Sequence, residues 1–235
     1  MIRKIESEHM GKSRRGWLTS WFHFSFAEYY NPDNIHFGAL RVINDDLIEP
    51  HTGFDTHPHR DMEIITYVVM GELTHIDSMK NERVLKRGEI QYMSAGTGVL
   101  HSEYNNSDTP LRLLQIWILP DREGYPPQYG EERFAWQERT GRFLHLVSGE
   151  DKTAPVRIHQ DVNLYAAELL DGKLLEFDVR PGRQAYLVLV EGEAEVNGVP
   201  LSERDAMEIV LEKLKIAAKP YAHILLFEMA REGAY

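Results

Sequence analysis

The sequence predicts an all-β protein built from antiparallel sandwiches or barrels. Short segments rich in β-branched and aromatic residues recur along the chain. Turns that contain Gly, Asn or Asp separate these segments. A segment near residue 190 also repeats one near residue 70. Short strands at regular spacing, divided by such turns, are typical of sandwiches and barrels.

In the first half of the chain, each expected strand ends at a turn signal. Gly71-Glu72 separates two apolar segments and reads as the turn of a hairpin. Pro120 ends the most apolar segment, because proline cannot donate to a β-ladder. The expected strands are Leu40–Asn44, Met62–Met70, Leu73–Ile76, Glu89–Met93 and Leu111–Leu119.

The 235 residues are expected to form two domains, 1–138 and 139–235. The boundary follows Pro120–Tyr129, where Gly and two further Pro residues interrupt the strand pattern. The second domain repeats the first weakly, since Tyr186–Glu193 is similar to Ile64–Glu72. We therefore expect a duplicated β-fold.

Composition excludes several classes of function. The chain has no cysteine, so it has no disulfide, no thiolate zinc site and no cysteine nucleophile. Its net charge of −11 is spread over both halves, which argues against binding nucleic acid. The apolar runs are too short to span a membrane, and no apolar segment follows the charged first residues, so we expect no signal peptide. We expect a cytoplasmic protein and take a monomer as the default.

Two short segments carry the candidate chemistry. On a strand, residues two apart share a face, so His57 and His59 point to one side, as do His101 and Glu103. If antiparallel strands place these pairs opposite each other, three imidazoles and one carboxylate converge. Such a set suits first-row divalent metals. Glu63 has the same parity as His57, so the residues alone leave its role open. The other histidines, His75 included, are expected to be ordinary structural or surface residues.

These segments resemble the paired motifs of the cupin superfamily, and the chain as a whole resembles the pirin family, including its bacterial pirin-like quercetinases. The resemblance covers nearly all of the first domain and, more thinly, the second. The stretches that carry it are Gly16–Leu18, His23–Ala27, Phe37–Asp46, Gly53–Glu63, Ser94–Gly98, His101–Asn105, Gln115–Ile118 and His159–Asp161.

The resemblance implies a bicupin, with two jelly-roll-like β-barrels in tandem and a metal only in the first. It implies that the ligands are His57, His59, His101 and Glu103. It also implies that Glu63, a ligand position in many other cupins, is not coordinated but lies in the second shell or the pocket. Asn105 and Gln115 are further candidates for these outer positions, from strand parity and from the neighbouring strand.

The function that the resemblance implies is a quercetin 2,3-dioxygenase, which cleaves a flavonol with O2 and releases CO. Glu103 would be its catalytic residue, accepting the proton of the flavonol 3-hydroxyl. One divalent metal is expected, Fe²⁺ first, with Cu, Ni, Co, Mn and Zn as alternatives. The alternative function is a non-enzymatic redox sensor, whose metal state controls binding to a transcription factor or a metabolic enzyme as protein partner.

Overall fold

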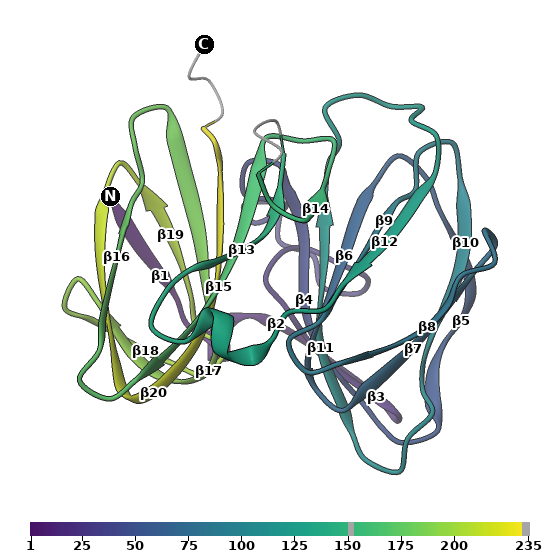
Figure 1. The fold of residues 1–235 in the computed structure, drawn as a ribbon, viewed down its shortest axis with the longest axis horizontal. Helices are drawn as coiled ribbons and strands as arrows, with labels where there is room; N and C mark the ends of the chain where they lie inside the picture. Colours follow the sequence, from purple (N-terminus) through teal and green to yellow (C-terminus); the bar gives the residue numbers. More distant parts are fainter. Residues whose placement is uncertain (150–152, 232–235) are drawn as a thin grey trace. The chain divides into compact units, whose positions relative to one another are not determined.

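The computed structural model describes residues 1–149 and 153–231, and nearly all of its regular structure is β (Figure 1). The chain divides into two compact units. One comprises Gly11–Phe134 with Ile158–Gln160, and the other comprises Met1–Met10, Ala135–Arg157 and Asp161–Tyr235. The all-β prediction is confirmed. None of the described helices is long and apolar enough to cross a membrane.

The N-terminal unit contains two sheets. The larger has the order β12 (Gln128–Glu132), β9 (Ile90–Ser94), β6 (Glu63–Met70), β11 (Leu111–Ile118), β4 (Leu40–Ile48), β3 (Leu18–Phe22) and β2 (Gly11–Arg15). The smaller has the order β5 (Thr52–His59), β10 (Val99–Asn105), β7 (Glu72–Asp77) and β8 (Glu82–Lys86). Apolar side chains from both sheets, such as Val68 and Leu73, pack together between them.

The expected strands of this unit are present, and two of them, β4 and β7, are longer than the apolar runs that predict them. The expected strand at Leu40–Asn44 continues to Ile48, because β4 pairs with β11 on one side and β3 on the other. Between β6 and β7, Gly71 has a φ of +83°. A Cβ at this position would lie 2.7 Å from the Pro110 carbonyl oxygen, so glycine is required on both counts.

The C-terminal unit is one sheet of order β1 (Ile2–Ile5), β19 (Ala206–Val210), β17 (Arg183–Val196), β20 (Lys213–Ala230), β15 (Val162–Leu170), β13 (Leu144–Ser148) and β14 (Val156–Arg157). In addition, β16 (Leu174–Asp178) pairs with β20, and β18 (Val199–Ser202) pairs with β17. Two 3₁₀ helices, Ser7–His9 and Trp136–Arg139, also belong to this unit.

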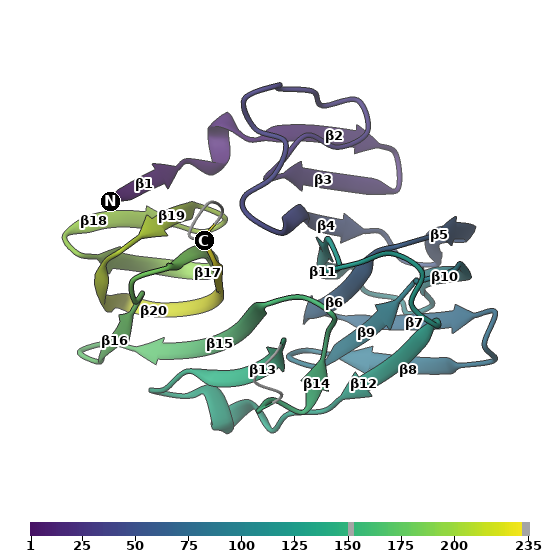
Figure 2. The ribbon, with the colours of Figure 1, turned by 90° about the horizontal axis from the view of Figure 1, so that it is seen from above.

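The first strand of the chain belongs to this second unit. β1 runs antiparallel to β19, with Ile2 opposite Ile209, and the two strands lie side by side in Figure 2. The proposed duplication has structural support at Gly192, whose φ of +83° equals that of Gly71. These units are defined by contacts within the structure, and the domain ranges expected from the sequence, 1–138 and 139–235, remain a prediction.

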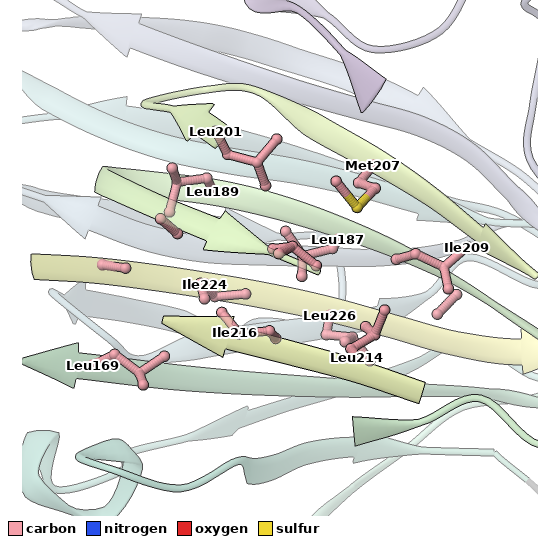
Figure 3. Packing of buried hydrophobic residues seen from close by; sticks show 14 of the residues in the cluster. Leu169, Leu187, Leu189, Leu201, Met207, Ile209, Leu214, Ile216, Ile224 and Leu226 are labelled. Carbon is pink, nitrogen blue, oxygen red and sulfur yellow. The ribbon is translucent and has the colours of Figure 1, made fainter. Parts of the chain in front are cut away.

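The interior of the C-terminal unit is filled by aliphatic side chains. Leucine and isoleucine residues from β15, β17, β19 and β20 point toward one another in Figure 3, and all are buried. Leu187, Leu214 and Leu226 are examples, with no exposed surface. In the described part of this unit, one group of three side chains could hold a metal ion. It consists of Glu6, Glu8 and His9 near the N-terminus, and two of the three are exposed.

Candidate metal centre

The pairing of β5 with β10 brings the two predicted motifs together. The strands are antiparallel, and His57 lies directly opposite His101. The register shifts after His101, so that Glu103 faces Phe54. This β-bulge re-aims the end of β10, as bulges beside functional sites often do. The structure brings His57, His59 and His101 together, whereas Glu103 is grouped with His101 and His75.

The three histidines form a compact cluster. The ring centroids of His57 and His101 are 4.5 Å apart, and each lies 4.8 Å from the ring of His59. One nitrogen from each ring lies within 4.8 Å of the others. Ligand atoms about 2.1 Å from a shared ion are at most about 4.2 Å apart, so small ring rotations would complete such a site.

The surroundings of His59 and His101 favour the neutral imidazole, the form that binds a metal. Burial lowers the pKa of His101 to about 3, with a further contribution from His57 and His75. Burial likewise lowers the pKa of His59 to about 4, and the neighbouring imidazoles add to the effect. The Nδ1 atom of His57 lies 2.7 Å from the Asp55 carbonyl oxygen. A donated Nδ1–H there leaves Nε2 free to bind a metal.

Glu103 is held by three neutral donors on strands of the larger sheet, β11, β6 and β9. Gln115 Nε2 donates to Oε2 over 2.6 Å. Thr66 Oγ1 donates to Oε1 over 3.0 Å, and Gln91 Nε2 donates to the same oxygen. Gln115 is thus placed beside the site, where the sequence expected it. Thr66 and Gln91 were not expected, because β6 and β9 belong to the larger sheet and come close to β10 only when the two sheets pack together.

His75 is a further side chain that sequence reasoning missed. It is fully buried on β7, directly opposite Glu103 in the β10 ladder. One of its ring nitrogens, one of His101 and one carboxylate oxygen of Glu103 lie within 4.8 Å of one another. The spacing of His75 and Asp77, two residues apart on one strand, is the signal that could have placed both side chains on the same, inner face.

A cavity of about 470 Å³ opens onto the cluster, within the usual size range of small-molecule sites. Phe26 and Trp117 meet edge to face on its wall, with centroids 5.4 Å apart, as do Trp17 and Phe54 at 5.1 Å. The lining surface of the cavity is mainly apolar, but polar side chains also contribute to it. Its polar lining is Ser13, Arg15, Ser20, Glu28, Asn44, Asp46, Asp55, His57, His59, Glu103 and Gln115.

Glu63 does not join the cluster. Thr66 points to Glu103, so Glu63, three residues earlier on β6, lies on the opposite face of that sheet. Its carboxylate accepts hydrogen bonds of 2.7 Å from both Tyr92 Oη and Ser94 Oγ, and one of 3.2 Å from the His159 backbone N–H. Parity with His57 left the role of Glu63 open, and that parity does not extend past the turn between β5 and β6.

Asn105 is also placed away from the cluster. Its side-chain amide donates to the backbone carbonyl oxygens of Ile48, Glu49 and Thr109. Its Oδ1 accepts from Ser107. These bonds fix the turn between β10 and β11. The structure therefore gives this buried amide a place in the turn and not in the pocket.

Comparison with known proteins agrees with the fold. The model of the family described as Pirin matches residues 5–118, and that of the quercetinase C-terminal cupin domain matches residues 145–229. Quercetin 2,3-dioxygenase of Escherichia coli K12 is 42% identical over 231 residues, which span 97% of this chain and 99% of that protein. A pirin-like protein of Caulobacter vibrioides is 42% identical and spans 98% and 100%.

Solved structures extend the agreement to three dimensions. The bacterial pirin YhhW of Escherichia coli in complex with nickel(II) superimposes with a TM-score of 0.92 at 41% identity, covering 98% of this chain and 100% of that one. A quercetin 2,3-dioxygenase of Acinetobacter baumannii, at 20% identity, shares the fold with a TM-score of 0.80, covering 99% and 80%. From its sequence, its two β-barrel units and its relatives, this chain belongs to the pirin family of cupin proteins.

Proposed function

We propose that this chain is a metal-dependent dioxygenase that cleaves a flavonol with O2 and releases CO. The observation that carries the proposal is the cluster of His57, His59 and His101 beside a cavity of about 470 Å³. His57, His59 and Glu103 line this cavity together with aromatic side chains. Relatives of the whole chain that bear the name quercetin 2,3-dioxygenase support the same class of reaction.

We propose His57, His59, His101 and Glu103 as the metal ligands. The donor set fits a first-row divalent metal, because it combines imidazoles with a carboxylate. Both ring nitrogens of His101 are buried and have no hydrogen-bond partner among the described residues, which leaves either able to bind. We propose Fe²⁺ as the metal. Cu, Ni, Co, Mn and Zn fit the same donors, and a related pirin holds nickel(II).

When bound, a divalent metal supplies a Lewis acid for the flavonol 3-oxygen. Glu103 is placed to take the proton that the 3-hydroxyl loses, because its carboxylate faces the cavity and is fixed by Gln115, Thr66 and Gln91. Edge-to-face aromatic side chains give the cavity flat walls against which a planar ring system packs and water is excluded. One O2 is consumed and one CO released for each flavonol cleaved.

The test is oxygen uptake with quercetin as substrate. The metal-free chain is reloaded separately with Fe²⁺, Cu²⁺, Mn²⁺, Co²⁺ and Ni²⁺, and the CO released is measured alongside. The His101→Ala variant is the control. We expect metal-dependent uptake, with CO equal to the O2 consumed, and none in the variant.

Uptake no greater than that of His101→Ala with every metal would refute the quercetinase proposal. Metal-dependent O2 uptake without release of CO would show that the chain oxidises quercetin, but it would refute the CO-releasing ring cleavage. In the first case, the redox-sensor alternative predicts that a partner protein binds the Fe²⁺ and Fe³⁺ forms with different affinities.

A further inference from the structure

Three buried ring nitrogens of His101 and His75 have no hydrogen-bond partner among the described residues, so a hydrogen bond of His101 is still to be assigned. They are Nδ1 and Nε2 of His101 and Nδ1 of His75. A histidine that binds a metal through one nitrogen almost always donates its other N–H to an acceptor, which orients the ring. His57 has such an acceptor in the Asp55 carbonyl oxygen. His101 needs one that the protein itself provides.

The hydrogen bond from His75 to Asp77 decides which atom can serve. Nε2 of His75 lies 3.3 Å from Oδ2 of Asp77. Asp77 is anchored as an acceptor, because it receives hydrogen bonds from the side chain and backbone of Asn81 and from the Met79 backbone N–H. A neutral imidazole that donates through Nε2 has a lone pair on Nδ1. His75 therefore presents a buried acceptor that needs a donor.

A second N–H on His101 would lie near the His75 ring, although no hydrogen bond joins the two rings in this structure. The rings of His75 and His101 have centroids 5.4 Å apart, and one nitrogen of each lies within 4.8 Å of the other. The carboxylate of Glu103 lies in the same group but accepts hydrogen bonds and cannot satisfy a lone pair. Stacking on Tyr129, at 4.8 Å and 19°, holds the plane of the His75 ring.

We propose that His75 is a positioning residue for the metal ligand His101: His101 binds the metal through one ring nitrogen and donates the other N–H to His75 Nδ1, while Asp77 holds His75 in the required tautomer. The inference rests on the metal centre of the proposed function and not on its substrate. It extends the centre outward from His101 through His75 to the turn at Asn81.

The experiment measures Ni²⁺ affinity of the full chain by competition with a chelator, and the absorption spectrum of the Co²⁺ form. The variants are His75→Phe, which removes the acceptor, and His75→Gln, which restores an amide oxygen as acceptor. The matched control is His223→Phe in the other unit. His223 is also fully buried and bonds a carboxylate, with Nδ1 2.7 Å from Glu191 Oε2.

We expect His75→Phe to weaken Ni²⁺ binding by about 10- to 100-fold and to shift the Co²⁺ bands, as loss of an outer hydrogen bond does. His75→Gln recovers most of the affinity, and His223→Phe leaves it unchanged. Unchanged affinity in a folded His75→Phe variant, checked by circular dichroism, would overturn the proposal.

Complete loss of Ni²⁺ binding in His75→Phe, as large as the loss in His101→Ala, would also overturn the proposal, because it would indicate that His75 itself is a metal ligand. Retained Ni²⁺ in His101→Ala would instead show that the metal centre is placed wrongly. Because none of these readouts uses quercetin, an inactive protein with normal Ni²⁺ binding refutes the proposed function alone.

Discussion

We predict that Asp46 lowers the stability of this protein at neutral pH and that the burial of its carboxyl group sets the size of the effect. The carboxyl group lies on β4 at the wall of the cavity and is 3% exposed. Burial raises its pKa from the usual 3.8 to about 7. A hydrogen bond with Ser20 opposes the shift, and the charges of Asp45 and Glu103 add to it. Ionising this group in the folded state is therefore costly.

The sign and size of the effect follow from linkage between protonation and folding. Below about pH 4 the carboxyl is protonated in both states and contributes nothing. Between about pH 4 and pH 7 the folded state keeps a proton that the unfolded state loses, so stability falls as pH rises. A pKa difference of about 3 corresponds to about 4 kcal/mol, which is reached above pH 7.

The perturbation is Asp46→Asn, which keeps the size of the side chain and removes its charge. Urea unfolding of the metal-free chain is followed by tryptophan fluorescence, since Trp17, Trp21 and Trp117 lie in the N-terminal unit. We expect the variant to gain stability over the wild type by about 1.4 kcal/mol per pH unit between pH 5 and 7. The exposed Asp33→Asn is the control. A difference that stays constant from pH 5 to pH 8 would refute the reasoning.

Three further predictions concern the framework of the N-terminal unit. Arg112→Met removes both hydrogen bonds to the buried Asp45, of 2.9 and 2.6 Å, and should cost about 3–5 kcal/mol in urea unfolding. A loss below 1 kcal/mol would mean that the pair is not buried in solution. Gly96→Ala should cost about 2–3 kcal/mol by the same measurement, because φ is +42° and the new Cβ would lie 1.9 Å from the Tyr125 carbonyl oxygen. Glu63→Gln should lower the thermal midpoint yet leave Ni²⁺ affinity unchanged, since Glu63 faces away from Glu103. A tenfold loss of affinity would contradict that placement.

The sequence by itself determined what depends on local periodicity. Strand alternation put His57 and His59 on one side of a strand, and the pairing of β5 with β10 places His101 opposite His57. The apolar segments and their turns predicted the all-β fold, which the structure confirms. Residue motifs also identified the pirin family, since they are specific enough to be read without coordinates.

Tertiary structure alone decided what depends on how strands pair over long distances. Parity along the chain put Glu63 with His57, but it does not survive the turn at Asp61, whose φ is +47°. The pairing of β7 with β10 brings His75 to Glu103 from a hairpin arm that carries no motif. Likewise, only the ladder between β1 and β19 shows that Ile2 belongs with Ile209.

The physical reason is that a strand's alternation is a local property, whereas its neighbours are chosen by the burial of whole faces. The pKa of Asp46 illustrates the same limit, because it depends on burial within the packed unit and on the charge of Glu103, which is distant in sequence. The sequence thus predicted the donors of the candidate metal centre. The fold decided which side chains surround these donors, orient them and shift the pKa values in the site.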